Sequence, residues 1–339
     1  MGVQELPFGR EALGILLGVT PGGWHFDPVL LSHWLRSDSP FFQWGSASLL
    51  FVENAAALLV SHDSRMTKGR LVAFSALRVN ERLSSAEQVS VVGRLLQAAA
   101  QWGRSRGAER LGGPLMLSTW NPYRVLADDR PNETNGFPGE GVEPAAYNLL
   151  YRAAGLQVTD RYVTTAPPED PDYWMFHLDR EAGISSRRAG RVAVLPLSPG
   201  DGLRLAPQVF EWLNSSFVHN PYFVALSGAE FGDWLMQSMP GGVEPVRLGA
   251  FDGDGTVLGV LAGFVAENRG ILKTVAVRPD AQGTRCAMAL TFEFHRRLFH
   301  RGITQVQHAL MHVNNSSARM SSKYARPVRH YVLYGTHCA

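Results

Sequence analysis

The sequence contains little cysteine, little lysine and no long apolar run. Its 339 residues include two cysteines, Cys286 and Cys338, too few for a disulfide-stapled secreted fold. Lysine occurs only as Lys68, Lys273 and Lys323, and the net charge of +2 is spread without basic blocks. The chain therefore lacks the electrostatic footprint of a nucleic-acid-binding protein, and we expect no nucleic-acid partner.

Several segments and motifs are also missing. No stretch approaches the roughly 20 apolar residues that span a bilayer, and the first residues do not form a charged region followed by an apolar one. We therefore expect no membrane partner and a cytoplasmic location. The sequence has no Gly-x-Ser-x-Gly elbow, no Gly-x-x-x-x-Gly-Lys loop and no telling spacing of metal ligands, so we predict no metal site.

The composition indicates a folded protein of two domains. Hydrophobic residues make up 45% of the chain, with 17 Phe and 8 Trp, which is ample for packed interiors. A length of 339 residues suits two domains of roughly 100 to 200 residues each. Regular patterning is weak between residues 166 and 203. We predict an N-terminal domain over 1–170, a linker over 171–203 and a C-terminal domain over 204–339.

The two sides of this linker show the same order of elements. On the C-terminal side the patterns predict a helix over 205–217, a hairpin turning at Asp252–Gly255, a strand over 271–277, a helix over 285–300, a strand over 304–313, a short helix and a last strand. The N-terminal side predicts strands, a helix from Val89 to Trp102, a short strand near Leu111 and a helix over 145–153. Residues 130–144, rich in Gly, Pro and Asn, predict a long surface loop that would suit a lid.

The most informative stretch is residues 275–287. It consists of a strand, a stop at Pro279, a polar turn with Gly283 and the start of a helix. The free N–H groups and positive dipole end at a helix N-terminus form an anion site, for which a pyrophosphate is a natural occupant. The stretch therefore predicts a nucleotide cofactor.

This stretch resembles the pyrophosphate loop of the GNAT acyltransferase family. That loop reads Gln or Arg, two residues, Gly, one residue, then Gly or Ala, just after a strand ending in Val-x-Pro. Gln282 and Ala287 match it, Gly283 is an addition found in many members, and Val277 stands two residues before the proline. Arg285 occupies the position of the central glycine, where it either crowds the loop or adds a cation.

A second motif follows this loop at the distance that is typical of the family. Members carry an Asn, an Ala three residues on and a helix with a Tyr after the following strand, and Asn315 and Ala318 match the first two. The resemblance implies acetyl-CoA or another acyl-CoA as cofactor, held by Val275, Ala276, Val277, Gln282, Gly283, Thr284, Arg285, Cys286, Ala287, Asn315 and Ala318.

The N-terminal side carries the complementary half of the family pattern. Residues 150–156 (LYRAAGL) resemble its closing motif Leu-Tyr-x-x-x-Gly-Phe, whereas residues 80–93 contain nothing like the phosphate loop. The resemblance thus implies two tandem GNAT-like domains of α/β (α+β) class, each a mixed, mostly antiparallel sheet flanked by helices. The implied activity is acyl transfer from acyl-CoA to a small-molecule amine in the C-terminal domain.

Candidates for proton transfer are less regular. The position of the family's tyrosine acid is Ser322 by spacing, so Tyr324 is the available candidate. For the base, Glu267 precedes the loop strand, and His308 and His312 share one face of the next strand. Each histidine has a structural, hydrogen-bonded role as its alternative.

Two other functions remain open. The departures at Arg285 and Ser322 favour a catalytically silent tandem GNAT that serves as a binding or scaffold module. A third possibility is an acyltransferase whose donor is an acyl carrier protein, for which a weak diphosphate loop would matter less. Gln282, Gly283 and Asn315 favour the CoA-dependent enzyme.

Overall fold

The computed structural model describes residues 2–19, 28–127, 136–170, 172, 176–177, 180, 192–237 and 242–338. The elements of the first half are β1 (Gln4–Pro7), α1 (Arg10–Gly18), α2 (Pro28–Trp34), η1 (Pro40–Gln43), β2 (Gly45–Val52), β3 (Ala56–Asp63), η2 (Met66–Gly69), β4 (Leu71–Val79), α3 (Ser85–Arg104), β5 (Arg110–Gly113), β6 (Val125–Leu126), α4 (Tyr147–Ala153) and β7 (Gln157–Ala166). The second half contains β8 (Ala193–Pro196), α6 (Pro199–Phe217), α7 (Gly228–Gln237), β9 (Glu244–Phe251), β10 (Val257–Ala266), β11 (Arg269–Val277), η3 (Pro279–Ala281), α8 (Cys286–Phe299), β12 (Gln305–His312), α9 (Ser316–Ser321) and β13 (Arg326–His337).

The strands form one continuous mixed sheet in the order β1-β2-β3-β4-β5-β13-β7-β12-β11-β10-β9-β8, with β6 paired to β13. This order repeats an internal unit, because β1 to β5 match β8 to β12, while α3 and α8 occupy equivalent places in the chain. The pairs β4–β5 and β11–β12 are parallel, and the other described pairs are antiparallel. The structure thus confirms the predicted class, two similar units of mixed, mostly antiparallel sheet flanked by helices.

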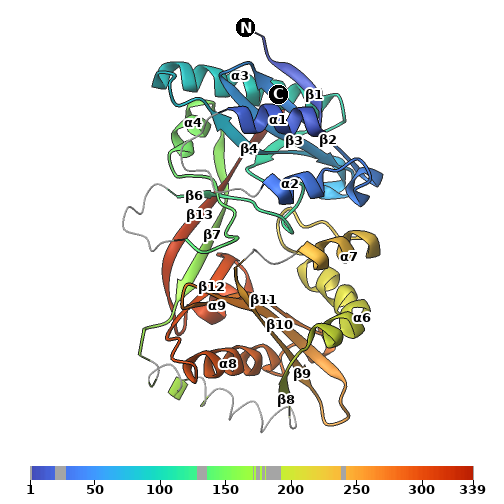
Figure 1. Cartoon of the computed structure of the whole chain (residues 1–339), viewed down its shortest axis with the longest axis vertical. Coiled ribbons are helices and arrows are strands. Elements are labelled where there is room, and N and C mark those ends of the chain that lie inside the picture. The colour runs from blue at the N-terminus through green and yellow to red at the C-terminus, as the bar shows by residue number, and fades with distance from the viewer. Residues whose placement is uncertain are drawn as a thin grey trace.

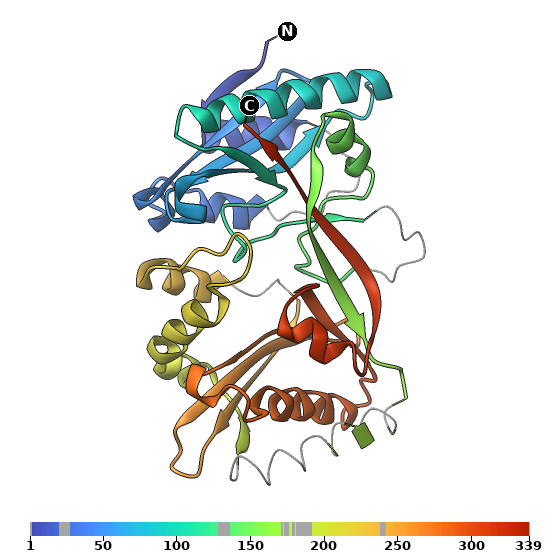
Figure 2. The same ribbon diagram turned by 180° about the vertical axis from the view of Figure 1, so that it is seen from behind.

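The two units exchange their last strands. β13, at the C-terminus, lies between β5 and β7 of the first half, whereas β7 lies between β13 and β12. Figures 1 and 2 show these two long strands crossing from one half of the molecule to the other. The central pairing is long, running from Arg326↔Ala166 to Gly335↔Gln157.

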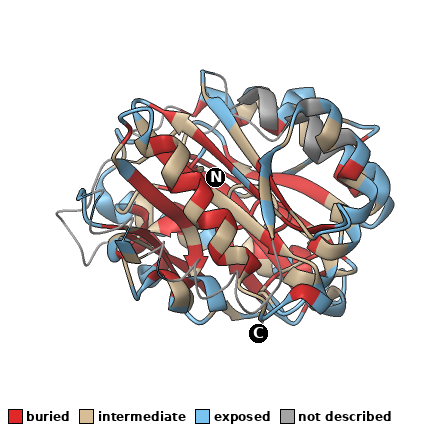
Figure 3. Cartoon of the chain, turned by 90° about the horizontal axis from the view of Figure 1, so that it is seen from below, coloured by how far each residue is buried: buried red, intermediate tan, exposed pale blue. Residues whose placement is uncertain are grey.

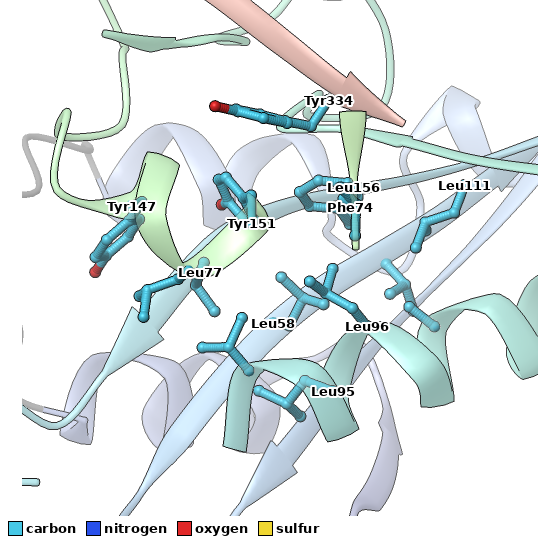
Figure 4. Close-up of a cluster of buried hydrophobic side chains, with 14 of the residues drawn as sticks. Leu58, Phe74, Leu77, Leu95, Leu96, Leu111, Tyr147, Tyr151, Leu156 and Tyr334 are labelled. Atoms are coloured by element: carbon cyan, nitrogen blue, oxygen red, sulfur yellow. The ribbon is translucent and has the colours of Figure 1, made fainter. Parts of the chain in front are cut away.

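Each half has its own apolar core on the helix-covered faces of the sheet. In the first half, Leu95 and Leu96 of α3 pack with Leu58, Phe74 and Tyr151 (Figure 4). In the second half, the corresponding contacts come from Leu290, Phe294 and Leu298 of α8, spaced four residues apart as the sequence predicts. Buried residues accordingly follow the strands and the inner helix faces, and exposed residues gather in loops (Figure 3).

Capping residues decide where two long helices begin. α3 starts with a capping box in which Ser84 and Glu87 satisfy each other's backbone N–H groups, and α6 starts with the same arrangement between Ser198 and Asp201. The second box places the start of α6 six residues before the predicted helix over 205–217. Strand β8 and the first turn of α6 fall inside the segment predicted as linker, 171–203, of which 171, 173–175, 178–179 and 181–191 lie outside the described residues.

The segment predicted as a surface loop or lid, 130–144, is largely internal where the structure describes it. Phe137, Glu140 and Glu143 are buried, with 6%, 7% and 3% of their surface exposed. Phe137 packs on Phe264 and Ile271 of the second half. Residues 130–135 of this prediction lie outside the described residues. For residues 136–144 the prediction of a surface loop was wrong, because Gly and Pro indicate backbone irregularity, and an irregular segment can still be buried when its side chains pair with other elements.

In the described part of the chain, no helix has both the length and the apolar character needed to cross a bilayer.

Candidate functional site

Each half contains a place where two parallel strands separate. β11 and β12 pair from Arg269↔Gln305 to Leu272↔His308 and then diverge. Beyond Leu272, no described strand pairs with the β12-facing edge of β11. The equivalent strands β4 and β5 diverge after Ala73↔Gly112. The fold thus creates two related gaps in one sheet, each beside the N-terminus of a helix.

In the N-terminal half this gap is filled by Glu143. Its carboxylate accepts a hydrogen bond from the backbone N–H of Leu77 at 3.2 Å, on the part of β4 that has left β5. The phenol of Tyr151 donates to the same carboxylate. Burial raises the pKa of Glu143 to about 7. The chain's own carboxyl group therefore occupies the free edge of β4.

The N-terminus of α3, the helix beside the N-terminal gap, is capped by a side chain. Glu87 stands in the first turn of α3 and accepts hydrogen bonds from the backbone N–H of Ser84 at 2.8 Å and from its hydroxyl at 2.6 Å. A carboxylate at this place repels a phosphate and takes up donors that an anion would use. The start of α3 is therefore poorly suited to binding a phosphate.

The N-terminus of α8, the helix beside the C-terminal gap, has no side-chain cap. α8 begins after Arg285 with no side-chain capping bond and no acidic residue in its first turn. Gly283 has φ +84°, and a Cβ built there would meet nothing within 4 Å. The first amides of α8 have no partner within the helix, so this turn presents donors for an anion.

Side chains of this turn differ in what they can offer. Arg285 adopts the left-handed conformation, φ +63°, which a glycine takes without cost and a larger residue takes at about 1 kcal/mol. Thr284 donates its hydroxyl to the carbonyl of Ala281 at 2.6 Å, and Gln282 is exposed. Cys286 is buried, which raises its thiol pKa to about 11, so only its backbone N–H is suited to contact an anion. The predicted set also includes Ala287 in the first turn of α8 and three residues at the end of β11, namely Val275, Ala276 and Val277.

Asn315 and Ala318 have a structural link with each other. The side-chain oxygen of Asn315 accepts a hydrogen bond from the backbone N–H of Ala318 at 2.9 Å and so caps α9. Ala318 is buried against Val163 and Met311. The amide NH₂ group of Asn315 is the part of this residue that remains suited to a cofactor contact.

The three residues predicted for proton transfer lie in different places. Glu267 lies in the turn between β10 and β11, is exposed, and pairs with Arg269 at 2.6 Å, at the opposite end of β11 from the turn that precedes α8. Tyr324 packs against Met288 of α8. The structure does not bring either of them to His312, and their predicted roles gain no support from this geometry.

His312 lies at the end of β12 in a hydrogen-bonded group. Its Nε2 is 3.3 Å from the Oδ1 of Asp160, and its Nδ1 accepts from the backbone N–H of Asn314 at 3.2 Å. The phenol of Tyr222 donates to the other oxygen of Asp160 at 2.7 Å. Because Nδ1 acts as an acceptor, the ring proton of neutral His312 belongs on Nε2, facing the carboxylate. Asp160 and Tyr222 were not identified from the sequence.

His308 has the structural role named as its alternative. Its Nε2 is 2.9 Å from Nε2 of His295, and its Nδ1 is 2.7 Å from the hydroxyl of Ser321. Burial lowers its pKa to about 4 and lowers that of His295 well below its usual value. Both rings are therefore neutral near pH 7, and they join α8, β12 and α9.

Lys273 and Arg124 are charged residues that sequence reasoning missed. Lys273 is the first residue of β11 after the strands diverge, and Arg124 donates to the carbonyl of Leu310 on β12 at 3.2 Å. Both therefore lie beside the point where β11 and β12 separate, which we call the vertex of the C-terminal gap. The sequence did contain a signal for Lys273, because it is one of only three lysines in the chain and stands in a strand predicted to be buried.

Similarity to known proteins is confined to structure. No protein-family model and no curated protein sequence matches the chain. A tandem GNAT protein from the clavulanic acid biosynthesis pathway is similar over 99% of both chains, with 11% identity and a TM-score of 0.56. A probable N-acyltransferase from Enterococcus faecalis V583 gives a TM-score of 0.58 at 10% identity, over 100% of this chain and 73% of its own.

A third solved structure gives a comparable match. A GCN5-related N-acetyltransferase from Sphaerobacter thermophilus is similar over 99% of this chain and 96% of its own, with 15% identity and a TM-score of 0.51. At such identities the similarity establishes the fold and nothing finer. The chain has the fold of tandem GNAT proteins.

Proposed function

We propose that this protein transfers an acyl group from an acyl-CoA to the amine of a small molecule, and that the reaction takes place in the C-terminal half. The observation that carries the proposal is the difference between the two halves. Glu143 occupies the N-terminal gap and Glu87 caps its helix, whereas in the C-terminal half no described strand pairs with the β12-facing edge of β11 beyond Leu272, and α8 has no side-chain cap. The solved structures of similar fold are described as N-acetyltransferases or a probable N-acyltransferase, which supports the class of reaction.

The residues around the open gap fit the parts of an acyl-CoA. The amides at the start of α8, with Gly283 and Arg285, suit the pyrophosphate. The β12-facing edge of β11 from Lys273 to Ala276, which pairs with no described strand, suits the amide groups of the pantetheine arm, because an extended chain can add to a strand edge. At the end of this edge, the carbonyl of Val277 already accepts from the hydroxyl of Ser216 at 3.5 Å. Acyl-CoA would supply an activated thioester, which an amine attacks directly.

His312 is the best-placed candidate for accepting the amine proton. Asp160 fixes its ring through Nε2, and Tyr222 holds Asp160. Both hydrogen bonds of the His312 ring are long, at 3.2 and 3.3 Å, so an incoming amine can displace Asn314 from Nδ1 at small cost. A neutral imidazole oriented by a carboxylate is an effective general base.

Calorimetric titration with acetyl-CoA tests the cofactor site. We expect micromolar binding to the unmodified protein and its loss in the double variant Gln282→Ala/Gly283→Asp, which places a carboxylate in the phosphate turn. The matched control is Arg82→Ala, an exposed residue in the equivalent turn before α3, which should bind as the unmodified protein does. Absence of binding to acetyl-CoA and to longer acyl-CoAs would overturn the proposal, and equal binding by the double variant would place the site elsewhere.

A further inference from the structure

A cluster of charged residues surrounds the vertex of the C-terminal gap. Lys273 contributes from β11, Arg124 from the segment before β6, and Glu140, which is buried, from the described residues between β6 and α4. Burial and the charge of Arg124 lower the pKa of Lys273, and the charge of Glu140 raises it, so the three groups interact electrostatically. The cluster therefore joins the two halves where the proposed acyl transfer would occur.

Lys273 has no hydrogen bond or ion pair with any described residue. Its ammonium group lies over the Phe137 ring, 5.4 Å from the ring centroid, in a cation–π contact that leaves its charge unneutralised. Burial, together with the charge of Arg124, lowers its pKa to about 8. The side chain is half-buried, so part of it is exposed to solvent.

Arg124 is more deeply buried and only partly satisfied. It is 3% exposed, and among the described residues its Nε has no hydrogen-bond partner. Its guanidinium carbon lies 3.2 Å from the ring centroid of Tyr123 and 4.4 Å from that of Tyr162. Aromatic faces stabilise a cation without neutralising it, so the positive charge of Arg124 remains in the cluster.

Glu140 cannot balance these two cations because it is already engaged. Its oxygens accept from Nε of Arg329 at 2.7 Å and from Nη2 at 2.9 Å. The phenol of Tyr331 donates to the same carboxylate. A bidentate pair of this kind neutralises one guanidinium. The described part of the cluster therefore keeps two positive charges in excess.

We infer that Lys273 and Arg124 form a binding site for one carboxylate group of a substrate. Arg124 is a buried cation with no counter-ion among the described residues, and an anionic ligand would offset the desolvation penalty of its charge. A monoanion suits the site, because Arg124 is already stabilised by two tyrosine rings and the diphosphate has its own place at α8. Which substrate carries the carboxylate rests on the proposed function: either the amine acceptor or the far end of the acyl chain.

The scarcity of lysine makes the site directly observable. In protein labelled with ¹⁵N-lysine, NMR detects only Lys68, Lys273 and Lys323, and the variant Lys273→Gln assigns the signal of interest. The probe is formate, the smallest carboxylate, added at constant ionic strength. We expect a saturable rise of about one unit in the pKa of Lys273, with Lys68 and exposed Lys323 unchanged. A Lys273 signal that formate does not move would overturn the inference.

Two paired comparisons identify the source of the carboxylate. In the presence of CoA, a response of Lys273 to glycine but not to methylamine assigns the carboxylate to the acceptor. A response to succinyl-CoA but not to acetyl-CoA assigns it to the acyl chain. A Lys273 that responds to formate but to neither pair shows that neither proposed source reaches the site and overturns its link to acyl transfer. Because formate binding requires no turnover, the anion site can be supported even if acyl-CoA binding fails, and the reverse also holds.

Discussion

At the scale of single residues, Glu143 shows how one side chain can close a site that the fold provides. The strand edge at Leu77 needs a hydrogen-bond acceptor once β5 has moved away, and the Glu143 carboxylate supplies it from within the chain. Burial disfavours the charged form of the Glu143 carboxyl group and raises its pKa to about 7. The folded state is therefore more stable when Glu143 is neutral. A pH-dependent contribution to stability follows.

We expect Glu143→Gln to remove this dependence. The folded pKa of about 7 lies above the ordinary 4.5, so the folded state binds more protons between these values. The stability contributed by Glu143 is thus complete below pH 4.5 and is lost as the pH rises through 7. Glutamine keeps an acceptor for Leu77 without the charge. Urea unfolding should therefore show the variant more stable by about 1 to 3 kcal/mol at pH 8 and equal to the unmodified protein near pH 4.

Glu140→Gln is the matched control for that measurement. It alters another buried glutamate of the same loop, but one that pairs with Arg329 as an anion. Loss of the pair should destabilise the protein at every pH above the acid range, by about 3 kcal/mol. If the free energy of unfolding changed with pH in the same way for Glu143→Gln and for the unmodified protein, Glu143 would not be a buried neutral acid.

The sequence pointed to some residues of the candidate site and not to others, for a physical reason. Gln282, Gly283 and Arg285 lie in one short segment, so local pattern alone brings them together, as the structure does. Lys273 and Arg124 are 149 positions apart in the sequence (273 − 124), and their electrostatic interaction arises only from the packing of the two halves. No local pattern contains such an interaction.

At the scale of elements, helices with a clear apolar period were predictable, including α3, α6 and α8, as was the β9–β10 hairpin with its Asp-Gly turn. Strand β7 was not predicted. Its first half alternates between exposed and half-buried residues, but residues 162–165 are all buried, because the strand passes from the surface into the centre of the sheet. One strand with two environments shows neither the alternating nor the continuous apolar pattern.

The cap of α9 gives a prediction at this scale. Asn315→Ala removes the oxygen that accepts from Ala318 and should cost about 1 kcal/mol of stability, so a loss of binding in that variant would be ambiguous. Asn315→Ser keeps a capping oxygen and removes the NH₂ group. We expect Asn315→Ser to unfold within about 0.5 kcal/mol of the unmodified protein and to bind acetyl-CoA about tenfold more weakly in calorimetry. Unchanged affinity in this variant would remove Asn315 from the cofactor site.

At the scale of the whole molecule, neither half is complete without the other. The strand partners of β13 are β5, β6 and β7, all from the first half, and those of β7 are β12 and β13, both from the second. Side chains add further links, including Arg65 with Glu230 at 2.7 Å and the indole N–H of Trp120 with the carbonyl of Val224 at 2.8 Å. Repetition of the elements was visible in the sequence, but it did not show that the repeats exchange strands.

Division of the chain tests this interdependence. Fragments 1–191 and 192–339, produced together, should associate one to one, and a tag on either should recover both with the circular dichroism of the intact protein. Produced alone, the first fragment leaves β5 and β7 without β13, and the second leaves β12 and β13 without β7, so each should aggregate through unpaired strand edges. Shortening the second fragment to 192–325 deletes only β13 and should abolish recovery of the first. If fragment 1–191 were instead a soluble monomer that unfolds cooperatively, the exchanged strand would be dispensable, and the two halves would be independent domains that happen to share a sheet.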